Sequence, residues 1–109
     1  MSLPESPIAD IDLFDIVGVR KDGGIDAVIA CSGPLDNSAE TLSRLAMKVR
    51  GYLSAIASNG FTNQYGEGPI RIFVSCDHGV SAEALNVINS LGREAAKQNV
   101  HLCLGDPVA

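Results

Sequence analysis

Three stretches of the chain carry side chains whose types and spacing could support chemistry. Cys76, Asp77 and His78 are consecutive, and a thiol close to an imidazole base is the pairing that activates a nucleophilic cysteine. Asp36 and Asp106 follow other apolar runs, as Asp77 does. Three carboxylates that meet at one edge of a sheet would suit a divalent cation, which prefers oxygen ligands.

Structural roles explain the same residues more simply. Cys76 has the parity of the aliphatic residues Ile72 and Val74, so its thiol is expected to face the core. The aspartates are common turn and capping residues. We therefore predict no catalytic residue, no metal site and no cofactor. If the protein binds a small ligand, the candidate residues are Asp36, Asp77, His78 and Asp106.

The composition excludes several classes of protein. The 109 residues suffice for one domain, and the 46% that are hydrophobic can bury a core, which excludes wholesale disorder. A net charge of −5 has the wrong sign for binding a nucleic-acid duplex. No apolar run is long enough to cross a membrane. Three separated cysteines form no disulfide framework, so we predict a cytoplasmic protein with reduced thiols.

Hydrophobic periodicity divides the chain into a flexible tail at 1–8 and a single domain at 9–106. An Asp-Gly-Gly turn at 22–24 is typical of a tight hairpin. The glycine-rich segment 60–69 is expected to fold back as a compact loop. The expected elements in chain order are strands at 13–21 and 25–32, a helix at 38–58, a strand at 70–76, a helix at 81–98 and a strand at 100–104.

The helical patterns predict which residues face solvent. Asn37 is the expected N-cap of the first helix, whose outer side should carry Arg44, Lys48 and Ser54. In the second helix, with Ser81 as N-cap, Gly92 is expected to mark close contact with a strand. The buried stripe of that helix is expected to comprise Ala84, Leu85, Ile88, Leu91 and Ala95.

The order β-β-α-β-α-β predicts a two-layer α/β sandwich. A hairpin followed by right-handed crossovers gives a mixed four-stranded sheet, order 1-2-3-4, with both helices on one face. Asp10, Asp12 and Asp15 are expected to be solvated residues at the sheet edge. Because an exposed Phe73 would need a partner, we predict a homodimer. The predicted interface residues on the uncovered face are Arg71, Phe73, Ser75 and His101.

Residues spread over about 11–104 carry a resemblance to a known family. They are Ile11-Asp12, Ile16-Val17-Gly18, Asp22-Gly23, Asp36, Leu42, Leu45, Lys48, Tyr52-Leu53, Ile56, Ser58-Asn59-Gly60, the strand 70–74 and the segment 81–85. This pattern resembles DUF6572, a small bacterial family of unknown function. The resemblance implies a bacterial protein and transfers no activity and no functional residue.

A second resemblance concerns the turn before the first helix. Gly33-Pro34-Leu35-Asp36 is similar to the Gly-x-Leu-Asp turn of sulfate-transporter/anti-sigma-antagonist (STAS) domains. This likeness implies a regulatory module that binds a small ligand or phosphate at the carboxyl edge of the sheet, with Ser81 as the acceptor. The residues themselves favour a non-catalytic protein-interaction module, with the STAS-like module as the alternative.

Overall fold

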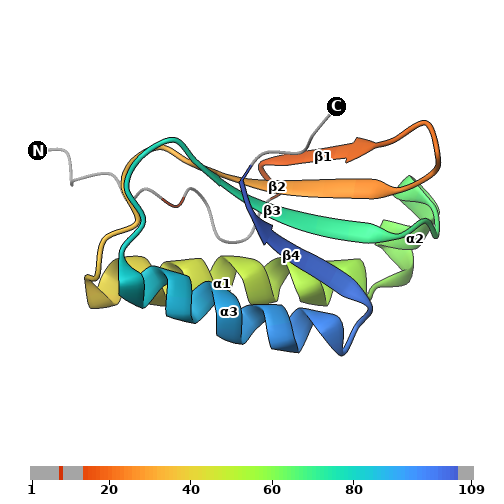
Figure 1. The fold of residues 1–109 in the computed structure, drawn as a ribbon. Coiled ribbons are helices and arrows are strands. Elements are labelled where there is room, and N and C mark those ends of the chain that lie inside the picture. The colour runs from red at the N-terminus through yellow and green to blue at the C-terminus, as the bar shows by residue number, and fades with distance from the viewer. Residues whose placement is uncertain (1–7, 9–13, 106–109) are drawn as a thin grey trace, which may run out of the picture.

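The computed structural model describes Ile8 and residues 14–105. The sheet has the order β1-β2-β3-β4, with β1 antiparallel to β2 and the other neighbours parallel. Helices α1 and α3 cover the same face of the sheet (Figure 1), so the predicted two-layer α/β fold is confirmed. The elements are β1 (Ile16–Val19), β2 (Ile25–Cys31), α1 (Ala39–Ile56), α2 (Asn59–Tyr65), β3 (Ile70–Cys76), α3 (Ala82–Ala96) and β4 (Val100–Leu104).

The β1–β2 hairpin depends on the conformation of one glycine, a hydrogen bond across the turn and one close backbone approach. Gly23 has φ +89°, a conformation that glycine adopts without a steric penalty. The Arg20 N–H donates to the Gly24 carbonyl at 2.7 Å and closes the turn. A Cβ at Gly68 would overlap the Gly23 carbonyl, so the segment before β3 lies directly against the hairpin. The Asp-Gly-Gly turn is therefore confirmed.

Both long helices begin at a serine. The Ser38 hydroxyl accepts a hydrogen bond from the Thr41 N–H at 3.2 Å, and the Ser81 hydroxyl accepts one from the Ala84 N–H at 3.1 Å. The prediction of Asn37 as the first N-cap is wrong, because Ser38 holds the extended backbone of a cap and its oxygen reaches the first free N–H groups. The predicted cap at Ser81 is confirmed.

Helix α2 stands where the sequence predicted a loop. Ser58 caps it by accepting from the Phe61 N–H at 3.3 Å, and Phe61 is buried. The ring centroid of Phe61 lies 5.7 Å from that of Phe14 and 4.7 Å from that of Tyr65. Seven residues form only about two helical turns, and with a single buried apolar residue they give almost no periodic signal, which explains why the pattern missed α2.

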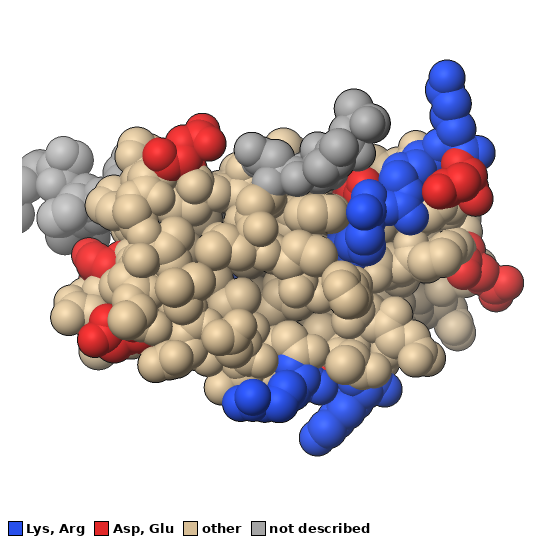
Figure 2. All heavy atoms as spheres, in the orientation of Figure 1, with Lys and Arg blue, Asp and Glu red and all other residues tan. Residues whose placement is uncertain are grey.

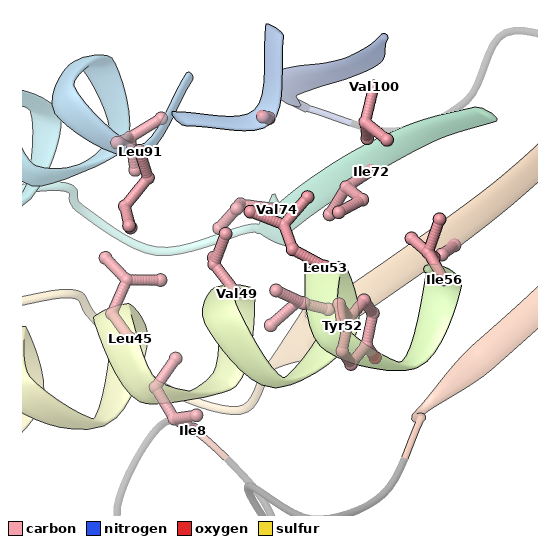
Figure 3. Close-up of a cluster of buried hydrophobic side chains, with 14 of the residues drawn as sticks. Ile8, Leu45, Val49, Tyr52, Leu53, Ile56, Ile72, Val74, Leu91 and Val100 are labelled. Carbon is pink, nitrogen blue, oxygen red and sulfur yellow. The ribbon is translucent and has the colours of Figure 1, made fainter. Parts of the chain in front are cut away.

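The core lies between the helices and the sheet. Figure 3 shows Val49 and Leu53 of α1 facing Ile72 and Val74 of β3. Ile8, the last residue of the predicted tail, is also buried and bridges Cys31 of β2, so packing begins at least one residue before the predicted boundary.

Two predictions for α3 are wrong. A Cβ at Gly92 would have no neighbour within 4 Å, so this glycine marks no close contact with a strand. Leu85 is exposed rather than part of the buried stripe.

In the described part of the chain, no helix combines the length and the apolar character that crossing a membrane requires.

Candidate functional site

The loops after β2 and β3 meet at the carboxyl edge of the sheet. Leu35 and Val80 form a parallel bridge, and the Leu35 N–H donates to the Gly79 carbonyl at 2.9 Å. This bridge brings together the loops that carry three of the four candidate ligand residues, Asp36, Asp77 and His78, all of which are exposed. The fourth candidate, Asp106, lies outside the described residues.

The polar groups at this edge already serve the helix ends. Asp36 accepts a hydrogen bond from the Ser38 N–H at 3.0 Å, and hydrogen bonds from Ser38 hold the pKa of Asp36 below its usual value. Ser81, the acceptor that the STAS likeness implies, uses its hydroxyl to cap α3. Among the described residues, no group of three or more His, Cys, Asp or Glu side chains could hold a metal ion. A phosphate bound here would have to displace these caps.

Two cysteines are neighbours at the same edge. Cys31 of β2 and Cys76 of β3 are partners in the parallel register, and both are half-buried free thiols. Burial, followed by the neighbouring Cys76, raises the pKa of Cys31 to about 12. The Cys76 Sγ lies 3.5 Å from the carbonyl oxygens of Gly33 and His78, either of which can accept a hydrogen bond from the thiol. At neutral pH Cys31 is therefore a thiol, which is a poor nucleophile.

A buried lysine contradicts two predictions. The Lys48 side chain is 0% exposed, and its Nζ lies 2.6 Å from Asp15 Oδ1. Asp15 Oδ2 also accepts from the Ala30 N–H at 2.9 Å. Lys48 is thus not on the outer side of α1 and Asp15 is not a solvated edge residue; Asp10 and Asp12, predicted alongside it, lie outside the described residues. Lys48 precedes Tyr52 by four positions and therefore lies on the stripe of α1 that packs against the sheet. The spacing could have placed Lys48 in the core, but its polar side chain suggested a surface position.

The Tyr52 hydroxyl completes this buried group. It accepts a hydrogen bond from the Asp15 N–H at 2.8 Å and donates one to the Val28 carbonyl at 2.9 Å. Burial raises the pKa of Tyr52 to about 12, so the hydroxyl keeps its proton. We call Asp15, Lys48 and Tyr52 the lysine cluster. It joins α1 and β2 to the segment before β1, and its amine is closed off from solvent.

A second charged group lies on the sheet face turned away from the helices. The Asp26 carboxylate accepts from Arg20 Nη1 at 2.9 Å, and from Arg71 Nε and Nη2 at 2.9 and 3.0 Å. The hydrogen bonds between Arg71 and Asp26 raise the pKa of Arg71. We call Arg20, Asp26 and Arg71 the arginine cluster. Both guanidinium groups are partly exposed, and basic atoms gather at this end of the sheet in Figure 2.

A groove of about 240 Å³ lies beside the arginine cluster. Ile16 and Val19 of β1 border it and are 55% and 54% exposed. Gly18 stands opposite Asp26 in the register, and a Cβ there would have no neighbour within 4 Å. The sequence pattern did not predict this edge groove; the feature that could have indicated it is a glycine between two β-branched residues, Val17 and Val19. Its lining residues are Ile16, Gly18, Val19, Arg20, Asp26 and Val28.

The four predicted interface residues share this sheet face. Arg71 and His101 are register partners, and His101 is exposed. Ser75 is half-buried. Phe73 is only 6% exposed, and its ring centroid lies 5.0 Å from the Arg71 guanidinium carbon. The exposed aromatic that the sequence predicted is therefore not present.

Comparison of the chain with protein-family models, curated proteins and solved structures gives no match. The resemblances to DUF6572 and to STAS domains stay predictions, and the function has to be argued from the geometry of the described residues.

Proposed function

We propose that this protein is a non-catalytic protein-interaction domain that binds an extended segment of a partner protein along β1. The edge groove is the observation that carries the proposal. β1 is the outermost strand of the described sheet, so one side of its backbone has no strand neighbour among the described elements. Unpaired N–H and C=O groups at a sheet edge are a template for another extended chain.

The side chains around β1 favour a partner of particular chemistry. Ile16 and Val19 line the groove and offer apolar contact, and Gly18, which lies on the same face of β1 as Ile16, leaves space for one incoming side chain. Each guanidinium group has five N–H donors, of which the bonds to Asp22 and Asp26 use only some. The remaining donors suit a carboxylate. We therefore expect a segment in which an apolar residue enters the groove and an acidic residue reaches Arg20 or Arg71.

We also propose that the domain is a cytoplasmic homodimer without enzymatic activity. The raised pKa of Cys31 and the burial of Lys48 support this proposal, because neither side chain is then available as a nucleophile. The net charge of −5 supports a protein partner rather than a nucleic acid. Ligand or phosphate binding at the carboxyl edge has less support, because Asp36 and Ser81 serve there as helix caps.

Selection from a randomised heptapeptide library tests the proposal. Selected peptides are expected to alternate apolar and acidic residues, and fluorescence anisotropy gives their affinity. Gly18→Val fills the groove and is expected to weaken binding about tenfold. A peptide bound at β1 would also shift the backbone amide resonances of Ile16–Val19.

Stability measurements separate lost binding from lost folding. Valine suits a strand better than glycine, so Gly18→Val is expected to keep or raise the melting temperature. Gly92→Ala on α3 is the matched control, since it also replaces an uncrowded glycine but leaves the edge groove untouched. Failure to select any peptide, or equal affinity of Gly18→Val and Gly92→Ala, would overturn the proposed peptide site.

A further inference from the structure

The helical layer carries a second surface with an apolar centre. A groove of about 290 Å³ runs between α1 and α3, and Leu42, Ala46 and Val87 contribute its apolar walls. Met47 of α1 is 49% exposed. Leu42, Ala46 and Val87 pack only partly against the core, and the remainder of their apolar surface lines this groove.

Charges of opposite sign lie at the two ends of this surface. Glu40 and Glu83 are in the first turns of α1 and α3, and both are exposed. The other end carries Arg50, Arg93 and Lys97, with the single carboxylate of Glu94 bonded to Arg50 at 3.3 and 3.1 Å. In Figure 2, acidic atoms gather where the helices begin and basic atoms lie below the later part of α3.

We propose that a second copy of this chain docks on this surface, with its helices antiparallel to those of the first. A twofold axis across the centre of the surface would place the acidic end of each copy on the basic end of the other. The surface is thus its own electrostatic complement. Met47, which has a flexible side chain, would enter the groove of the partner subunit at the centre.

The charges at the two ends of the surface also stabilise the helices themselves, but this role does not explain the apolar centre. Acidic residues at the start of a helix and basic residues at its end also stabilise that helix through its macrodipole. The macrodipole does not account for the exposed Met47 or for the apolar groove. A partner copy accounts for the charges and the apolar centre together. This arrangement would leave both edge grooves facing outward and free to bind peptides.

The inference rests on the proposed homodimer and assigns its interface. Sedimentation equilibrium at low salt, over a range of concentrations, is expected to give a monomer–dimer equilibrium for the wild type. The acid-reversed variant, Glu40→Lys with Glu83→Lys, has two basic ends. The base-reversed variant, Arg93→Glu with Lys97→Glu, has two acidic ends. Each variant alone is expected to dimerise at least about tenfold more weakly.

Mixing the two variants provides the decisive comparison. Because opposite ends then face each other again, the mixture is expected to form a heterodimer of about wild-type affinity. Both variants change only exposed side chains, so circular dichroism is expected to show an intact fold for each.

A matched pair of substitutions tests the apolar centre. Met47→Lys is expected to weaken the dimer about tenfold or more, because it places a charge at the centre of the interface. Leu85→Lys is the control, since Leu85 is exposed and apolar but lies two positions before the groove residue Val87 and therefore on the opposite side of α3.

The outcomes distinguish the interface from the homodimer itself. A monomer at every concentration would overturn both. Two outcomes would overturn this interface and leave the homodimer intact. One is a dimer that survives both charge reversals, and the other is a mixture in which the two variants form a heterodimer no more tightly than each forms a homodimer. Peptide binding at the edge groove is measured separately and depends on neither outcome.

Discussion

The lysine cluster and the arginine cluster use the same chemistry in different surroundings. In each, one aspartate carboxylate holds basic side chains. Lys48 is completely buried, whereas Arg20 and Arg71 are partly exposed on the sheet face. Water can replace a lost partner at the arginine cluster, and it has no access to Lys48. The first cluster therefore holds the fold together, and the second is the one to which we assign recognition in the proposed function.

This difference has a physical basis in desolvation. Removing one member of a buried ion pair leaves the other charge without compensation, which costs about 3–5 kcal/mol. In the arginine cluster Asp26 is also buried, but Arg20 and Arg71 are partly exposed, so water can solvate both guanidinium groups when the carboxylate is lost. The loss is therefore expected to be closer to the roughly 0–1 kcal/mol of a surface pair. The following substitutions compare the two clusters.

Removal of the carboxylate beside Lys48 is expected to have the largest effect. Asp15→Ala should lower the free energy of unfolding by about 3 kcal/mol or more, because it removes the carboxylate paired with the buried Lys48 amine and leaves the Ala30 N–H without its acceptor. Urea denaturation measures this loss. Adding Lys48→Met should restore much of the stability, since the buried positive charge is then gone. A loss below about 1 kcal/mol for Asp15→Ala would contradict the conclusion that the lysine cluster holds the fold together.

Removal of one hydroxyl is expected to have the next largest effect. Tyr52→Phe keeps the ring but leaves the Asp15 N–H and the Val28 carbonyl without their partner, at a cost of about 1–3 kcal/mol. Tyr65→Phe is the control, because the Tyr65 hydroxyl has no hydrogen bond among the described residues. Equal urea midpoints for the two variants would show that the Tyr52 hydroxyl contributes nothing.

Alkaline pH is expected to weaken the same region. The pKa values of Tyr52 and Cys31 are each about 12 in the folded chain, above the ordinary values of 10.0 and 9.0. The unfolded chain therefore loses these protons at lower pH than the folded chain, and stability should fall as the pH rises from about 9 toward 12. Tyr52→Phe and Cys31→Ala should each flatten this decline in a pH series of melting temperatures. If melting temperature falls with pH as steeply in both variants as in the wild type, Tyr52 and Cys31 do not cause the alkaline loss of stability.

The contrast between the clusters also shows what a sequence can predict. Strand alternation is local, so it predicted the β3 and β4 bounds, and the hairpin with two right-handed crossovers predicted the sheet order. The Lys48–Asp15 pair joins residues 33 positions apart, and each looks like an ordinary surface residue alone. The edge groove depends on the absence of a side chain at Gly18, which no polarity pattern records. Ser38 displaced Asn37 as N-cap because both types can cap, and only the backbone path decides between them.

The carboxylate of the arginine cluster is expected to matter least for stability. Asp26→Asn keeps the shape of the side chain but removes the charge shared by Arg20 and Arg71, and we expect a loss of about 1 kcal/mol. Both guanidinium groups can turn to water, which limits the loss.

Salt sharpens this last comparison. Dissolved ions screen partly exposed charges much more than buried ones. The loss caused by Asp26→Asn should therefore shrink between dilute buffer and molar sodium chloride, whereas the loss caused by Asp15→Ala should stay the same. Urea midpoints of both variants and the wild type at the two salt concentrations measure the difference. If both losses respond equally to salt, the clusters are equally accessible to solvent, and the division between a structural clamp and a recognition surface does not hold.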